Sequence, residues 1–129
     1  MDSIAPGARL IALIVCDTIH VERDGHKTVA HMMSMLRLEC LPAAIDLTLF
    51  ARYTVSKGSH NVSFRFIDPS CMDILKSQVS STIVSSGSPP RELILRSEVN
   101  IVQRGNHEVQ LIIDDQIVGV APIMILSGR

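Results

Sequence analysis

The chain has 129 residues, about the length of one domain, and a formal net charge of -1. Its hydrophobic fraction is 47%, but aromatic residues make up only 3% and tryptophan is absent, so the core must be aliphatic. Balanced charge argues against a surface that attracts phosphate backbones or acidic membranes. The scarcity of aromatic residues argues against a stacking platform for single-stranded nucleic acid. We therefore expect one soluble domain over residues 1–129, with no nucleic-acid or membrane partner.

The number and spacing of the cysteines indicate the compartment in which the protein resides. Cys16, Cys40 and Cys71 lie far apart, without a C-x-x-C pair, which argues against a disulfide framework and fits a reducing environment. The apolar run Leu10–Cys16 is too short to span a bilayer and lacks the flanks of a signal peptide. The sequence therefore predicts a cytoplasmic protein.

In chain order, the first expected strand is Leu10–Val15, which is apolar on both faces, as in a strand covered from two sides. Asp24-Gly25 is a hairpin signal that would turn the chain. Residues 29–41 are ambiguous, because their apolar residues match helical spacing as well as they match a bent strand. We favour a strand, since the Asp-Gly turn must supply a partner for the strand before it; a helix is the alternative.

Period-two alternation dominates the middle of the chain. Every second residue between Asp46 and Lys57 is apolar, and Phe50 is the one apolar residue on the polar side. After a turn at residues 57–60, Val62, Phe64 and Phe66 alternate with polar residues. These two runs predict a hairpin, which Asp68-Pro69 ends because proline has no N–H for a ladder.

The rest of the chain predicts four further strands separated by Gly-, Pro- or Asp-containing turns. These strands are residues 78–85, 93–101, 109–113 and 117–126. The first is serine-rich, with Val79 and Ile83 in phase, and suits a sheet edge. Residues 86–90 form a linker-like loop, and Asp114-Asp115-Gln116 forms a tight turn. Seven or eight short strands in all indicate an all-β fold, a two-sheet antiparallel β-sandwich.

The order of these pieces resembles an uncharacterised, mostly bacterial family of small single-domain β-sandwich proteins. The resemblance runs through an apolar strand ending in an acidic residue, Ala12–Asp17, and the turn and strand Asp24–Val29. It continues through Phe66-Ile67-Asp68-Pro69 and the closing hairpin from Gly105 to Pro122. The resemblance implies the fold and supplies no activity and no functional residue.

The five histidines show none of the spacings H-x-H, H-x-x-x-H or H-E-x-x-H. A cluster of His20, Glu22 and His26 around the Asp-Gly turn could hold zinc, but three solvated hairpin residues explain the pattern better. His107 and Glu108 are adjacent, and neighbours on a strand point to opposite faces. No glycine-rich loop cradles a phosphate. The sequence thus indicates no metal ligand and no cofactor.

The cysteines and serines also lack a catalytic setting. Cys16 and Cys40 lie in apolar runs and should behave as small hydrophobic residues, whereas Cys71 should be exposed. The serines between Ser77 and Ser88 include no G-x-S-x-G motif and are better explained as edge-strand and loop residues. The sequence therefore names no catalytic residue, and leaves open whether the protein is an enzyme.

Asp17 breaks the apolar pattern of its strand. Strict alternation with Leu13, Val15 and Ile19 places its carboxylate inward, where it would need hydrogen bonds to offset the cost of burial. We interpret it as a structural carboxylate that accepts backbone N–H groups; binding to a partner or ligand is the alternative.

The cluster Met32, Met33 and Met35, together with Leu36 and Leu38, has more apolar residues than one buried face can use. This excess predicts self-association. We expect a non-enzymatic interaction or structural module whose partner is another protein or a second copy of the chain. The alternative is a small-ligand-binding protein or enzyme with a site between the sheets or at a sheet end.

Overall fold

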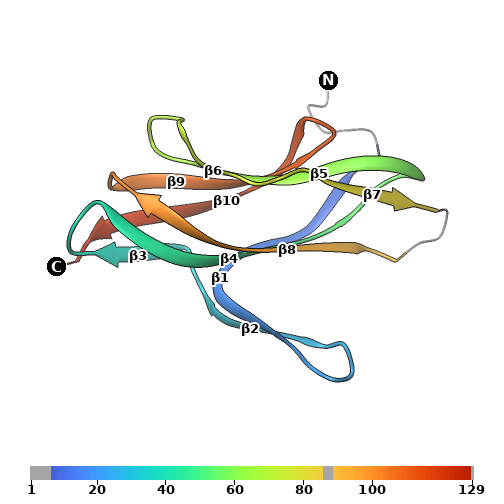
Figure 1. Ribbon diagram of the computed structural model, residues 1–129, viewed down its shortest axis with the longest axis horizontal. Coiled ribbons are helices and arrows are strands. Elements are labelled where there is room, and N and C mark those ends of the chain that lie inside the picture. Colours follow the sequence, from blue (N-terminus) through green and yellow to red (C-terminus); the bar gives the residue numbers. More distant parts are fainter. Residues whose placement is uncertain (1–6, 86–88, 129) are drawn as a thin grey trace.

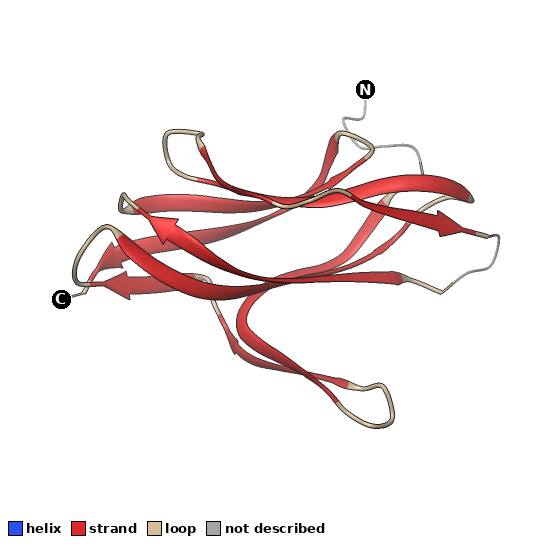
Figure 2. Ribbon diagram, in the orientation of Figure 1, coloured by secondary structure: helices blue, strands red, loops and turns tan. Residues whose placement is uncertain are grey.

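The computed structural model describes residues 7–85 and 89–128, which form ten strands and no helix (Figures 1 and 2). The strands make two sheets that pack face to face. Sheet A contains, in spatial order, β2 (Lys27–Met32), β1 (Arg9–Val21), β4 (Ala43–Thr54) and β8 (Arg91–Ile101). Sheet B contains β3 (Met35–Leu38), β10 (Gln116–Ser127), β9 (Gly105–Ile113), β5 (Gly58–Ile67) and β6 (Asp73–Lys76), and β7 (Ser80–Val84) also pairs with β5.

The predicted all-β sandwich is confirmed, but the number of strands is ten rather than seven or eight. The extra strands include β3 and β6, which have four residues each and are too short to show a clear alternation. The pairings are antiparallel except that of β3 with β10, which is parallel.

The core lies between the two sheets and is mostly aliphatic, with Tyr53, Phe64 and Phe66 as its aromatic members. Alternate residues of β4, β5, β8, β9 and β10 supply it, as their period-two pattern predicts. Its fully enclosed side chains include Leu49, Phe64, Phe66, Ile101, Leu111, Ile113, Ile123 and Ile125. The predicted inward faces of residues 46–57, 62–66 and 109–113 are therefore correct.

The predicted hairpin between residues 46 and 66 is wrong. β4 pairs with β1 and β8 in sheet A, whereas β5 pairs with β6, β7 and β9 in sheet B. The short connection between β4 and β5 crosses from one sheet to the other. Alternation identifies the buried face of each strand but not its neighbour, and both strands turn their apolar faces to the same core.

Both predicted turns at acidic residues are confirmed. At Asp24-Gly25 the N–H of Gly25 donates to the carbonyl of Glu22 at 3.0 Å, and Gly25 has φ +88°, as in a type I turn followed by a bulge glycine. Asp114 and Asp115 join β9 to β10 with φ values of +50° and +64°, which define a type I′ turn.

The β1–β2 hairpin bends away from β4 and folds beneath the outer face of sheet A (Figure 1). β1 pairs with β4 only as far as Cys16, after which the Thr48 hydroxyl donates to the backbone carbonyl of Asp17 at 3.1 Å. The hairpin explains why Thr48 and Phe50 are buried on the outer face of β4, against the pattern of their strand. Residues 29–41 contain two strands and no helix, as we favoured.

The sheets end in strands of different length. β7 pairs with β5 alone, which confirms the predicted edge position, although Val79 and Ile83 face solvent rather than the core. β8 is the edge of sheet A and pairs with β4 alone among the described residues. Of the predicted linker-like loop, residues 86–88 lie outside the described residues.

Candidate functional site

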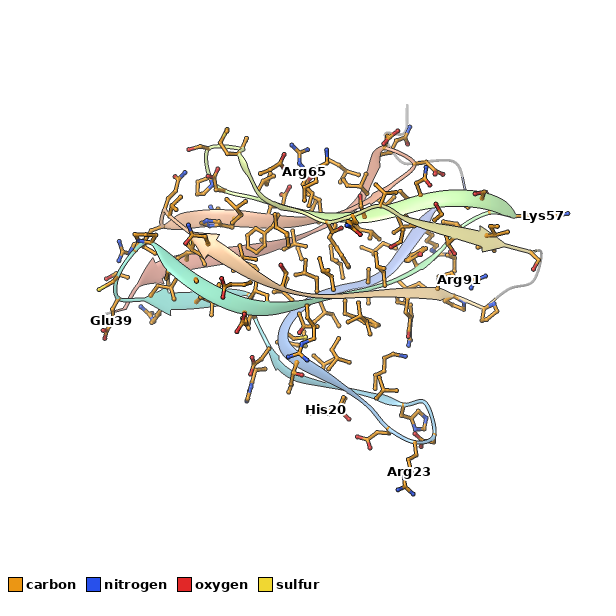
Figure 3. All side chains as sticks on the ribbon, viewed as in Figure 1. His20, Arg23, Glu39, Lys57, Arg65 and Arg91 are labelled. Atoms are coloured by element: carbon orange, nitrogen blue, oxygen red, sulfur yellow. The ribbon has the colours of Figure 1, made fainter. Side chains whose placement is uncertain are left out.

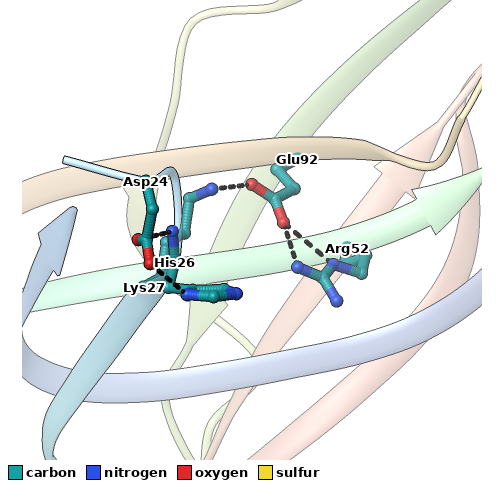
Figure 4. Close-up of polar contacts among 5 residues, drawn as sticks. All are labelled: Asp24, His26, Lys27, Arg52 and Glu92. Atoms are coloured by element: carbon teal, nitrogen blue, oxygen red, sulfur yellow. Dashed lines mark hydrogen bonds and ion pairs between the residues drawn. The ribbon is translucent and has the colours of Figure 1, made fainter. Parts of the chain in front are cut away.

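The proposed zinc residues lie on the exposed β1–β2 hairpin without converging on one point. The Nδ1 atom of His26 lies 2.7 Å from the Asp24 carboxylate (Figure 4). The Thr28 hydroxyl donates to Glu22 at 3.5 Å. In Figure 3 His20 and Arg23 extend from the hairpin away from the sandwich. No group of three potential metal ligands occurs within residues 7–85 and 89–128. His20, Glu22 and His26 are all exposed on the hairpin.

The three cysteines are free thiols in different surroundings. Cys16 is buried, and its burial, followed by the adjacent Asp17 charge, raises the pKa of the thiol, which disfavours the nucleophilic thiolate. Cys71 is exposed, as predicted. Cys40 is also exposed, so its prediction as a buried residue is wrong: β3 ends at Leu38 and Cys40 lies in the following turn.

Asp17 is exposed, and the prediction that its carboxylate points into the core is wrong. Its side chain retains 55% of its accessible surface and lies 3.3 Å from Nδ1 of His31. Alternation fails here because the chain leaves sheet A directly after Cys16, so the inward direction no longer meets the core. His31, opposite Asp17 in the hairpin, has φ +56°, which marks the same bend.

The buried structural carboxylate belongs instead to Asp68, where β5 ends. Asp68 is 6% exposed, and its Oδ1 accepts the N–H groups of Ser70 and Met72, both at 2.9 Å. Its Oδ2 accepts the Gln103 amide at 3.1 Å. The sequence signal was the Asp-Pro pair itself, because aspartate before a turn commonly accepts the N–H two residues later.

A histidine–carboxylate pair that the sequence did not indicate ties two turns together. The Nδ1 atom of His60 lies 2.6 Å from the Asp114 carboxylate, and Nε2 lies 2.8 Å from the Ser56 carbonyl oxygen. The hydrogen bond to Asp114, followed by that to Ser56, raises the pKa of His60. The Asn61 N–H, followed by His60, lowers the pKa of Asp114. Both ring nitrogens face acceptors, so the protonated imidazolium satisfies both.

His107 and Glu108 point to opposite faces of β9, as predicted. The His107 ring is buried edge-on to Phe66, with 6.0 Å between ring centroids. Glu108 lies on the outer face of sheet B, where it accepts the Gln110 amide at 2.7 Å. The two groups cannot act on one substrate.

An ion-pair network fastens the hairpin to the outer face of sheet A. Glu92 on β8 pairs with Lys27 of β2 and with Arg52 of β4, whose Nε donates at 2.8 Å (Figure 4). The Lys27 bond, followed by that of Arg52, lowers the pKa of Glu92. These charges are all engaged within the chain, so the network serves the fold.

A cleft of about 290 Å³ opens between the sheets along the edge formed by β8. Phe64, Leu75, Leu93 and Leu95 line it with apolar surface, and Ser77 and Gln78 add polar groups. The cleft exists because the strand opposite β8 is interrupted between β6 and β7. As a result, Leu93 and Leu95 point inward yet remain only partly buried.

The edge of β8 beside this cleft is the most distinctive surface of the molecule. Its register with β4 runs without a shift from Arg91↔Tyr53 to Ile101↔Ala43, so the strand has no bulge, and its sequence contains no proline. In the described part of the chain, no other strand covers its second side. Natural sheets normally protect such an edge with a bulge, a proline, a covering segment or charged side chains, because it can pair with another strand; of these devices β8 has charged side chains.

Exposed methionines lie on β2, the opposite edge of sheet A, and on β3, an edge of sheet B. Met32 and Met35 are 70% and 54% exposed, whereas Met33 packs against the core. A second depression, of about 220 Å³, is lined by Met32, Met33 and apolar residues of β1 and β10. The excess of apolar residues noted in the sequence therefore reaches the surface.

The described residues contain no helix that is long and apolar enough to cross a membrane.

Fold and surface define a two-sheet β-sandwich with an open edge strand. The chain belongs to a family of unknown function, DUF6941, whose model matches residues 11–126. This confirms the resemblance to an uncharacterised family. No curated protein matches the sequence.

Solved structures are similar to the chain at low identity. The chain is similar to part of an alkylpurine DNA glycosylase, AlkC, from Pseudomonas fluorescens, solved with DNA containing an abasic-site analogue, with a TM-score of 0.55 and 10% identity. The match covers 94% of this chain but only 31% of the glycosylase. A β-glucosidase from Listeria innocua matches with a TM-score of 0.46 and 10% identity, over 93% of this chain and 16% of the enzyme. The chain thus spans a minor part of each protein, and the glycosylase likeness shows the fold alone.

Proposed function

We propose that this chain is a non-enzymatic interaction module that associates with a second copy of itself. The observation that supports this most is the free edge of β8, an 11-residue strand with no bulge. A long, regular, partly apolar edge is a template for pairing with another strand. The proposal includes a cytoplasmic location, which the three free thiols support.

The chemistry of the other candidate residues supports the same proposal. Cys16 is a buried thiol whose pKa is raised. The His60–Asp114 pair has all its polar atoms engaged with the fold, and so has the Glu92 network. In the described residues, accessible and reactive side chains do not gather at one place, whereas the unpaired edge of β8 lies beside the partly exposed Leu93 and Leu95.

The test is the mass of the protein in solution across a concentration series, measured by light scattering. A mass that rises to a multiple of the chain mass supports the proposal. A monomer throughout the micromolar range would overturn it.

A second function, binding of a small apolar ligand, is favoured by the cleft beside β8. Its lining combines apolar walls with the polar groups of Ser77 and Gln78, the composition typical of ligand pockets. The probe is 8-anilinonaphthalene-1-sulfonate, titrated into the native protein and into Leu95→Gln. Saturable fluorescence that Leu95→Gln weakens supports a ligand site, and no enhancement with the native protein counts against it.

A further inference from the structure

We infer that β8 pairs antiparallel with β8 of a second copy about a two-fold axis at Ser97, joining the two A sheets into one continuous sheet. This rests on the proposed self-association and adds its surface and its register. A two-fold contact of this kind is closed, because each copy presents the same strand to the other.

The accessible edge suits a second copy better than the other edges do. β8 has 11 residues, whereas the edge strands of sheet B have four or five. The other edge strand of sheet A, β2, belongs to the hairpin that folds beneath the sheet. In a two-fold contact, each pair of opposite residues occurs twice. The longest regular edge strand therefore forms the most backbone hydrogen bonds between the two copies.

Charge complementarity selects the register. Side chains alternate between faces, so antiparallel registers of β8 with itself differ in steps of two residues. With Ser97 opposite its own copy, Arg96 lies opposite Glu98 of the second copy, and Glu98 opposite its Arg96. Moving the axis to Arg96 or to Glu98 sets like charges opposite each other. An axis at Leu95 opposes Glu92 to Glu98, and like charges directly opposite are destabilising.

The charges that this register pairs have no ionic partner among the described residues. Arg96 and Glu98 are exposed on the outer face of sheet A, and neither makes an ion pair with any residue the structure describes. The register between β4 and β8 places Asp46 directly opposite Glu98. An Arg96 from the second copy on the free side of Glu98 would offset this repulsion between two carboxylates.

The inner face is equally compatible with the Ser97 axis. The same register sets Leu95 opposite Val99 of the second copy and Leu93 opposite its Ile101. Leu93 and Leu95 are the residues of β8 that the open cleft leaves partly exposed. Pairing would therefore extend apolar contact along the cleft while Arg96 and Glu98 pair on the opposite face.

Reciprocal charge reversal tests the register. In a homodimer, Arg96→Glu sets two carboxylates opposite each other, and Glu98→Arg sets two guanidinium groups opposite each other. Each variant alone should therefore have the mass of a monomer at concentrations where the wild type is a dimer. An equimolar mixture of the two variants should recover the dimer mass, because every opposite pair is again a carboxylate with a guanidinium group. Recovery on mixing also shows that both variants are folded.

The matched control is Arg23→Glu, the same charge change at the exposed tip of the hairpin, which should stay dimeric. If the wild type is an oligomer that both reversals leave intact, the β8 register is wrong while the proposed self-association stands. Variants that stay monomeric when mixed, with native circular dichroism, would also overturn the register. A monomeric wild type would overturn both.

Discussion

Asp68 collects three hydrogen bonds at the end of β5 and is the carboxylate on which local structure depends most. Its partners are the N–H groups of Ser70 and Met72 and the amide of Gln103, a residue 35 positions away. The Asp68 carboxylate is a buried acceptor that binds backbone N–H groups of its own turn and a side chain of the connection between β8 and β9. It therefore fixes both segments. Asp17, by contrast, is held by one long contact to His31 on an exposed surface.

Removing the Asp68 carboxylate should destabilise the protein, whereas removing that of Asp17 should not. Asp68→Ala leaves buried donors unsatisfied and should lower the free energy of unfolding by about 1–3 kcal/mol. Asp68→Asn keeps one acceptor oxygen and should cost less. Asp17→Ala should stay within about 0.5 kcal/mol, because the bond from Thr48 goes to the backbone of Asp17. Urea unfolding of the three variants checks this order, and equal stability of Asp68→Ala and wild type would contradict it.

The His60–Asp114 pair should make stability fall as pH rises above about 6.5, the unfolded pKa of histidine. The pKa of His60 is raised in the folded state, so its contribution is complete below the unfolded value of about 6.5 and is lost as pH rises through the folded value. The pKa of Asp114 is lowered, so its contribution is lost only as pH falls into the acid range. His60→Gln keeps one donor but cannot become charged.

The corresponding measurement is the free energy of unfolding of the wild type and of His60→Gln at a series of pH values. The advantage of the wild type should be largest at about pH 5–6 and should shrink as pH rises above about 6.5. An advantage that is constant over this range would show that the imidazolium does not contribute.

Among the elements, the β9–β10 turn has a backbone that its sequence does not favour. Asp114 and Asp115 both have positive φ, and a type I′ turn prefers glycine at its second position. Asp115→Gly should therefore raise the free energy of unfolding by about 1 kcal/mol, because glycine adopts this conformation without steric cost.

Asp114→Gly is the matched control within the same turn. It relieves the same backbone but removes the acceptor of His60 and Asn61, so it should lower stability. Thermal unfolding midpoints of the two variants check the prediction. A lower midpoint for Asp115→Gly would mean that its side chain contributes more than the backbone conformation costs.

The elements that the sequence predicted well are those whose alternation continues to the core. The inward faces of β4, β5 and β9 and both acidic turns follow from residues close together in the chain. Strand partners depend on contacts between distant residues, so the crossing from β4 to β5 had no local signal. The inward direction predicted for Asp17 was wrong for the same reason. The bend after Cys16 depends on the tertiary contacts of the hairpin, which the local sequence does not indicate.

The candidate site could be predicted only in part. The sequence indicated excess apolar residues at Met32–Leu38, and Met32 and Met35 are indeed exposed. It could not indicate β8 as an edge, because an edge strand and a central strand share the same alternation. The residues that bind the carboxylates of Glu92 and Asp114 likewise lie far away in sequence.

At the scale of the whole molecule, two sheets enclose an aliphatic core and differ in how their edges are treated. The hairpin covers part of the outer face of sheet A, and short strands end sheet B. The edge of β8 is left long, regular and uncovered among the residues that the structure describes. We expect a sandwich with one such edge to assemble through that edge. Two-fold pairing of β8 with β8 gives a closed dimer.

Amide hydrogen exchange of β8 at low and high protein concentration tests this account most directly. In a strand paired on one side only, alternate N–H groups point to solvent, and a second copy would protect them. We predict that exchange in peptides covering Leu93–Ile101 slows with rising concentration, while exchange in β7, an edge that takes no part, does not change. Exchange in β8 that is the same at both concentrations, in a protein whose mass has doubled, would contradict pairing through this edge.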